Sequence, residues 1–85
     1  MRTKGEYRVG INLNPYGDDL VGQIKRKAAD LIDLIEAIDC TPQSSDNLGA
    51  HAGEVYRLKV LAQCEIESAA MWAIKAATKP PLSQD

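Results

Sequence analysis

The chain has 85 residues, a formal net charge of −2 and two cysteines, so it can hold one small domain, residues 1–85. A domain of this size buries roughly 60–65% of the surface that its unfolded chain exposes, and it gains much from a disulfide, a metal or a partner subunit. Cys40 and Cys64 lack metal-ligand spacing and His51 is the only histidine, so no metal site is expected. Subunit association remains as the source of extra burial.

The N-terminal residues contain no apolar signal-peptide region, and no run of about eighteen apolar residues occurs. We therefore expect a cytosolic protein with reduced thiols and no membrane partner. Residues 1–27 carry six basic and three acidic groups, a charge of +3, and residues 28–85 carry four basic and nine acidic groups, a charge of −5. This balance disfavours a DNA partner. The basic N-terminal end either binds a small anion or is simply solvated.

The first eighteen residues are predicted to form an extended arm and a turn. In the stretch "EYRVGINL", apolar residues alternate with polar ones, which is typical of extended backbone. Asn14 before Pro15 favours a turn, and Gly17 permits a positive φ. Asp18 or Asp19 is expected to cap the helix that follows.

Two helices follow, over residues 19–39 and 46–78, with a tail over residues 79–85. In the first helix, apolar residues recur every three or four positions: Leu20, Ile24, Ala28, Leu31, Ile35 and Ile38. Val21, Ile32 and Leu34 widen this stripe. Pro42 ends this helix, Ser45 or Asp46 can cap the next, and Pro80-Pro81 ends the second. Because the connection is short, the helices must pack antiparallel. The predicted fold class is therefore all-α, a two-helix antiparallel hairpin with a short extended N-terminal arm.

One hairpin partner can cover only one stripe of the second helix. That stripe is predicted to contain Leu48, Ala52, Val55, Leu58 or Lys59, Ala62, Ile66, Ala69, Ala73 and Ala76. Other apolar residues of this helix point elsewhere: Val60, Leu61, Cys64, Met71, Trp72 and Ile74. We expect the same surface of another subunit to cover them in a homo-oligomer.

The sequence contains no catalytic set, so we expect neither an enzyme nor a cofactor. Aromatic and basic residues gather instead near the arm and the first helix, a combination that suits a nucleotide: Tyr7, Asn14, Tyr16, Lys25, Arg26 and Lys27. The alternative, that Tyr7 and Tyr16 merely pack against helix ends, stays open. Tyr56, Arg57 and Lys59 form a second small polar cluster in the longer helix.

Three segments in this order resemble a phage helical-hairpin family: the "NP-x-G" turn, "AADLIDLIEA" and "AAMWAIKA". Its members are the anti-CBASS protein 2 and Thoeris anti-defence protein 1 types. The resemblance covers about residues 11–78, and the length favours the shorter anti-CBASS type. It implies a homohexamer that binds and sequesters cyclic di- and trinucleotide messengers of CBASS immunity without degrading them. Cyclic GMP-AMP and cyclic tri-adenylate are such messengers, and the place of action is the cytoplasm of the infected bacterial host.

The resemblance also implies two kinds of ligand site. The dinucleotide site lies between paired subunits and uses an N-terminal aromatic residue and a lysine of the first helix. The candidates are Tyr7, Asn14, Pro15, Tyr16, Lys25 and Lys27. The trinucleotide site uses an arginine of the second helix, which Arg57 matches, and a small polar residue of the first helix. Lys27 stands where that small residue is expected, which is a departure from the family pattern.

A second class of function fits the same oligomer. A small helical interaction or adaptor protein would show the same assembly and would bind no nucleotide.

Overall fold

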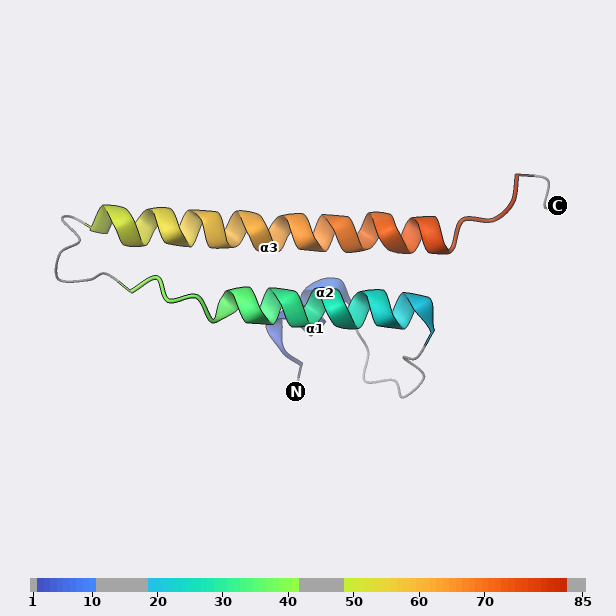
Figure 1. The fold of residues 1–85 in the computed structure, drawn as a ribbon, viewed down its shortest axis with the longest axis horizontal. Helices are drawn as coiled ribbons and strands as arrows, with labels where there is room; N and C mark the ends of the chain where they lie inside the picture. Colours follow the sequence, from blue (N-terminus) through green and yellow to red (C-terminus); the bar gives the residue numbers. More distant parts are fainter. Residues whose placement is uncertain (1, 11–18, 42–48, 83–85) are drawn as a thin grey trace.

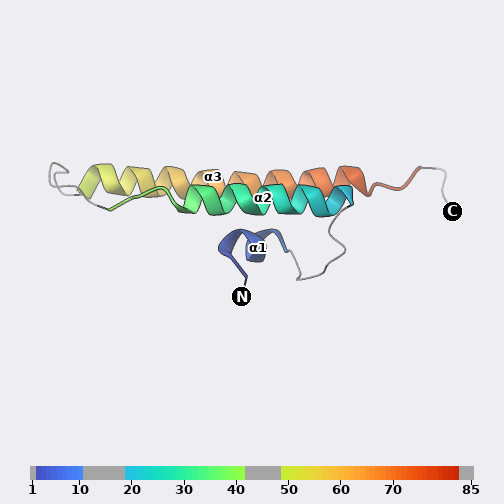
Figure 2. The ribbon, with the colours of Figure 1, turned by 60° about the horizontal axis from the view of Figure 1, so that its bottom comes forward.

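The computed structural model describes residues 2–10, 19–41 and 49–82, and these residues form three α-helices and no β-strand. α1 spans Lys4–Val9, α2 spans Leu20–Glu36 and α3 spans Ala50–Ala77. α2 and α3 lie side by side and run in opposite directions, and α1 lies against one side of this hairpin (Figures 1 and 2). The prediction of an all-α fold is confirmed for the described residues.

α2 begins where the sequence supplies a cap. The Asp19 carboxylate accepts a hydrogen bond from the backbone N–H of Gly22 at 2.8 Å, which satisfies one of the amides that a helix start leaves unpaired. The helix ends at Glu36, and the N–H groups of Ala37 and Ile38 donate to carbonyls three residues earlier, which tightens the last turn. α2 therefore lies within the range 19–39 that the sequence indicates.

α3 begins after Gly49, whose φ of 72° is in the left-handed region that favours glycine. The expected caps, Ser45 and Asp46, lie outside the described residues. With 28 residues against 17, α3 is roughly 42 Å long and α2 roughly 26 Å long. The first turns of α3 extend past the end of α2, beside the segment that leaves α2 (Figure 1).

The prediction of an extended N-terminal arm is wrong for Lys4–Val9, which are helical. The Thr3 hydroxyl accepts from the Glu6 N–H at 3.1 Å, and the Glu6 carboxylate accepts from the Thr3 N–H at 2.8 Å, so both ends of a capping box are made. Gly10, with a φ of 77°, ends the helix. These local signals prevail over the alternating apolar pattern. The rest of the expected arm, including Ile11 and Leu13, lies outside the described residues.

The buried core is small, and on α2 it consists of Ile32, which belongs to the widened predicted stripe, and Ala29, which the prediction did not include. Ala29 and Ile32 are fully buried, whereas Leu20 and Leu31 are 62% and 44% exposed. Ala29 is covered because α1 also packs on α2, with Gly5 against the backbone of Ala29. On α3 the buried residues are Ala52, Gln63 and Ala70.

Several large apolar side chains of α3 are exposed in the single chain. Trp72 is 68% exposed, Met71 is 65% exposed and Leu61 is 46% exposed. The radius of gyration is 17.0 Å, against about 12 Å for a compact domain of this length. One chain therefore leaves much apolar surface in contact with water.

Candidate functional site

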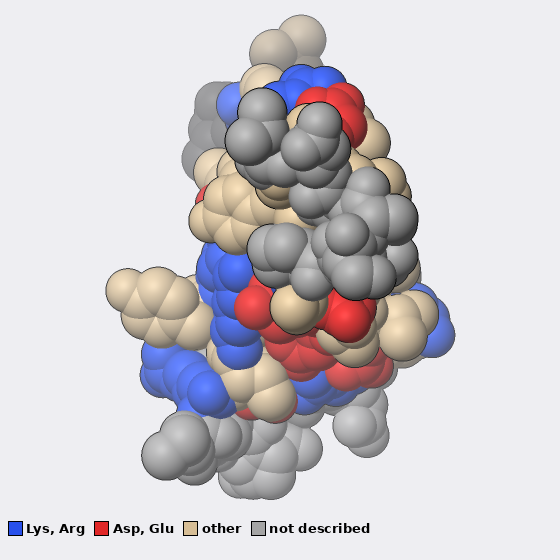
Figure 3. Space-filling view, turned by 90° about the vertical axis from the view of Figure 1, so that its left-hand side faces the viewer, with Lys and Arg blue, Asp and Glu red and all other residues tan. Residues whose placement is uncertain are grey.

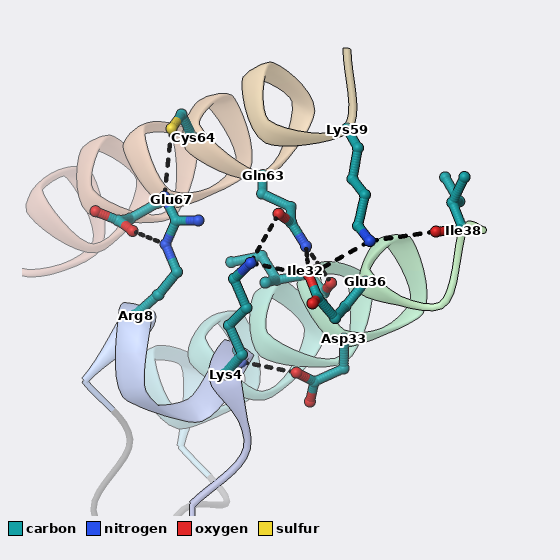
Figure 4. Close-up of polar contacts among 11 residues, drawn as sticks. Lys4, Arg8, Ile32, Asp33, Glu36, Ile38, Lys59, Gln63, Cys64 and Glu67 are labelled. Carbon is teal, nitrogen blue, oxygen red and sulfur yellow. Dashed lines mark hydrogen bonds and ion pairs between the residues drawn. The ribbon is translucent and has the colours of Figure 1, made fainter. Parts of the chain in front are cut away.

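A buried glutamine joins the three helices (Figure 4). Gln63 of α3 has no exposed surface, and its amide nitrogen donates to the Ile32 carbonyl at 3.1 Å and to the Glu36 carboxylate at 3.0 Å. Its amide oxygen accepts from Lys4 Nζ of α1 at 3.3 Å. The buried amide thus has partners for both its nitrogen and its oxygen, as a polar group in a core requires.

Glu36 receives donors from α1 and α3 at a single oxygen. Its Oε1 accepts from Lys4 Nζ at 2.8 Å and from Gln63 at 3.0 Å, and Lys59 Nζ lies 3.9 Å away. The hydrogen bond from Gln63, followed by that from Lys4, lowers the pKa of Glu36 from its ordinary value of 4.5 to about 2. The ionised carboxylate is therefore the form that holds α1 on the hairpin.

This pKa predicts a loss of stability in acid. Because the folded-state pKa of Glu36 lies below the ordinary value, its ionised form stabilises the fold above pH 4.5, and this contribution disappears as the pH falls towards about 2. We expect the urea midpoint of the wild type to fall more steeply over this range than that of Glu36→Gln. Denaturation curves at several pH values measure this. Glu65→Gln, at an exposed carboxylate of α3, should follow the wild type. Parallel curves for the wild type and Glu36→Gln would contradict the assignment.

Two further ion pairs fix α1. The Arg8 guanidinium donates to the Glu67 carboxylate at 2.7 Å and to Cys64 Sγ at 3.3 Å, both on α3. On the other side, Glu6 pairs with Arg26 of α2 at 2.8 Å. α1 is therefore attached to both long helices.

Three of the six basic residues within residues 1–27 form these ion pairs. Lys4, Arg8 and Arg26 each pair with a carboxylate of the same chain. Within the described part of the chain, no carboxylate lies within ion-pair distance of Lys25 or Lys27. Seen along the hairpin from the end with the α2–α3 connection, basic and acidic side chains are intermixed (Figure 3). Among the described residues, Lys25 and Lys27 are thus the cations of α2 that form no ion pair.

Tyr7 and Lys25, the pair that the resemblance implies for a dinucleotide, lie on helices that pack together. Tyr7 is 73% exposed on α1, and Lys25 is partly buried on α2. Tyr7 follows Glu6 and Lys25 precedes Arg26, so the Glu6–Arg26 ion pair joins the two helices next to both residues. The other candidates of this set, Asn14, Pro15 and Tyr16, lie outside the described residues.

Arg57 and Lys27, the pair implied for a trinucleotide, are not brought together within one chain. Gln63 lies opposite Ile32 in the antiparallel hairpin, and Arg57 and Lys27 lie on opposite sides of this point. Roughly 16 Å of helix rise separates them along the hairpin. The Arg57 guanidinium makes two hydrogen bonds to Glu54, at 2.8 Å and 3.0 Å. An anion at Arg57 must replace this carboxylate.

Sequence reasoning did not identify Gly5 and Gln63 as important. Gly5 is buried, and its N–H donates to the Asp33 carboxylate at 2.7 Å. The Thr3-x-x-Glu6 capping signature and the polar Gln63 between apolar turns of α3 were the signals present in the sequence.

Metal binding and membrane insertion find no support in the described residues. These residues contain no group of three or more His, Cys, Asp and Glu side chains arranged to hold a metal ion. Nor do they contain a helix with the length and apolar character needed to cross a membrane.

Comparison with known proteins gives a family and no individual relative. Residues 6–78 match the family described as Acb2/Tad1, hairpin domain. Neither the search of curated proteins nor the search of solved structures found a match. The family match spans α2, α3 and most of α1, the elements that form the hairpin and carry Tyr7, Lys25, Lys27 and Arg57. The chain therefore belongs to the Acb2/Tad1 hairpin-domain family.

Proposed function

We propose that the protein is a phage anti-defence sponge that binds and sequesters cyclic di- and trinucleotide immune messengers without degrading them. Membership of the Acb2/Tad1 family over residues 6–78 is the observation that carries this proposal. In the infected bacterial cytoplasm, sequestration would keep such messengers from their host effector. Cyclic GMP-AMP and cyclic tri-adenylate are the expected ligands, and the anti-CBASS type is the expected subtype.

The exposed side chains support this proposal on chemical grounds. A cyclic dinucleotide carries flat bases and anionic phosphates, which aromatic faces and lysines bind. Tyr7 is exposed on α1, and Lys25 and Lys27 have no carboxylate partner among the described residues. We assign these three residues to the dinucleotide site, with Asn14, Pro15 and Tyr16. We assign Arg57 to the trinucleotide site, together with Lys27 of another subunit.

Calorimetric titration of the purified protein tests the proposal. The ligands are cyclic GMP-AMP, cyclic di-GMP, cyclic tri-adenylate and a cyclic ADP-ribose isomer. We expect tight binding to at least one of them, and chromatography after denaturation of the protein should recover that ligand intact. No heat with any ligand, from a folded oligomer, would instead favour an interaction or adaptor protein that binds no nucleotide.

The proposal includes a homohexamer assembled through α3. Trp72 is 68% exposed in the single chain, with Lys75 Nζ 5.5 Å from its ring centroid. If another subunit buries this ring, Trp72→Ala should cost about 3–5 kcal/mol. We expect light scattering to show a smaller assembly and the melting temperature to fall. Leu82→Ala, in the tail and fully exposed, is the control. An unchanged mass and melting temperature in Trp72→Ala would place Trp72 outside the interface.

A further inference from the structure

The close approach of α1 to α2 depends on the absence of a side chain at Gly5. A Cβ at this position would overlap the Ala29 carbonyl oxygen and would lie 2.8 Å and 2.9 Å from the Ala29 carbonyl carbon and Cα. Real Cβ atoms essentially never approach other atoms so closely. All three atoms belong to the backbone of α2, so no side-chain rotation can relieve the overlap.

The conformation of Gly5 gives no other reason for a glycine. Gly5 lies inside α1, and the glycines with positive φ among the described residues are Gly10 and Gly49. Gly5 is the second residue of α1, where alanine would have the higher helix propensity. Gly5 therefore weakens α1 as an isolated helix and favours its contact with Ala29.

The docking of α1 determines where Tyr7 lies. The Tyr7 side chain is 73% exposed, so its own packing contributes little to its position. The residues around it hold the helix: the Gly5 N–H donates to Asp33, Glu6 pairs with Arg26, and Arg8 pairs with Glu67. Since Gly5 is two residues before Tyr7 in the same short helix, moving α1 away from Ala29 also moves Tyr7 relative to α2.

We propose that Gly5 is a positioning residue of the cyclic dinucleotide site, which acts by letting α1 dock on Ala29 and so fixes the place of Tyr7 relative to α2. This inference rests on the proposed function, because it concerns the ligand of the same site. Gly5 itself need not touch the ligand.

The test is Gly5→Ala in the full-length protein, titrated with cyclic GMP-AMP. We expect binding to weaken at least about tenfold, since a base loses its stacking partner. Hydrogen exchange should show faster exchange of the α1 amides, while the amides of α2 and α3 remain protected. Gly53→Ala is the matched control: Gly53 lies inside α3, and a Cβ at this position would have no other atom within 4 Å, so binding should not change.

A second pair of variants tests the same docking without adding a side chain to α1. Asp33→Ala removes the acceptor of the Gly5 N–H, whereas Asp33→Asn keeps an oxygen acceptor. We expect weaker binding and faster α1 exchange in Asp33→Ala, and recovery of both in Asp33→Asn. If Asp33 only stabilised the α2–α3 hairpin, Asp33→Ala would lower the urea midpoint without a selective increase in hydrogen exchange of the α1 amides.

The outcomes separate this inference from the proposed function. Wild-type affinity in Gly5→Ala, with the wild type binding cyclic GMP-AMP, would overturn the positioning role and leave the sponge intact. Weaker binding in Gly5→Ala, with the α1 amides as protected from hydrogen exchange as in the wild type, would also overturn the positioning role, because α1 would then still be docked. A wild type that binds none of the cyclic nucleotides would overturn both.

Discussion

Lys25→Ala should weaken the binding of a cyclic dinucleotide by roughly ten- to a hundredfold, because a hydrogen bond to a charged group contributes about 1.5–3 kcal/mol. No described carboxylate pairs with Lys25, so its removal breaks no ion pair among the described residues. Tyr7→Ala should have an effect of similar size through lost base stacking, about 1–3 kcal/mol. Calorimetry measures both affinities, and thermal denaturation should show little change in stability.

Two control variants accompany these substitutions, one at the same position as Tyr7 and one at a lysine in a different part of the chain. Tyr7→Phe retains the aromatic face and should bind nearly as the wild type. Lys79→Ala removes a lysine beyond the end of α3 and should not affect binding. Full affinity in both Tyr7→Ala and Lys25→Ala would show that the dinucleotide binds elsewhere on the protein.

Gln63→Ala should lower the free energy of unfolding by about 2–4 kcal/mol, through a cavity and through lost hydrogen bonds in the interior. The side chain is completely buried and bonds to Ile32, Glu36 and Lys4, one partner from α1 and two from α2. Urea denaturation at one fixed protein concentration measures the change, since association shifts apparent stability.

Glu65→Ala provides the comparison for this variant, because Glu65 is an exposed residue two positions further along α3. We expect its unfolding free energy to lie within about 0.5 kcal/mol of the wild type. If Gln63→Ala lost less than about 1 kcal/mol, the buried side chain and its hydrogen bonds would contribute little to stability.

The two long helices were predictable from the sequence, whereas α1 and the polar core were not. Apolar spacing indicates α2 and α3, and a prolyl pair indicates the end of α3. α1 has six residues, too few for periodicity to distinguish a helix from an extended arm, so its capping box decided the outcome. Gln63 could not be placed because apolar patterning assigns cores to apolar residues, and only the meeting of three helices supplies its partners.

The candidate site was predictable only in part. Family resemblance selects Tyr7, Lys25 and Arg57, and the sequence indicates on which helix each long-helix residue lies. The sequence cannot indicate which basic residues form ion pairs within the chain, because the partners of Lys4, Arg8 and Arg26 follow from how α1 docks. Tyr7 was expected on an extended arm, and its position on a docked helix depends on the contact between Gly5 and Ala29.

The internal pairing of Lys4, Arg8 and Arg26 has a kinetic consequence for any anionic ligand. Long-range attraction in solution depends on the summed charge of a surface, and salt screens it beyond about 10 Å. Here the net charge is −2, and three of the six N-terminal cations already face carboxylates. On the proposed function, an anionic cyclic nucleotide is therefore not attracted from a distance, and its association rate constant should not fall as the ionic strength rises. On the proposed function, tight binding would therefore come from slow dissociation, and the dissociation rate constant is the quantity to measure.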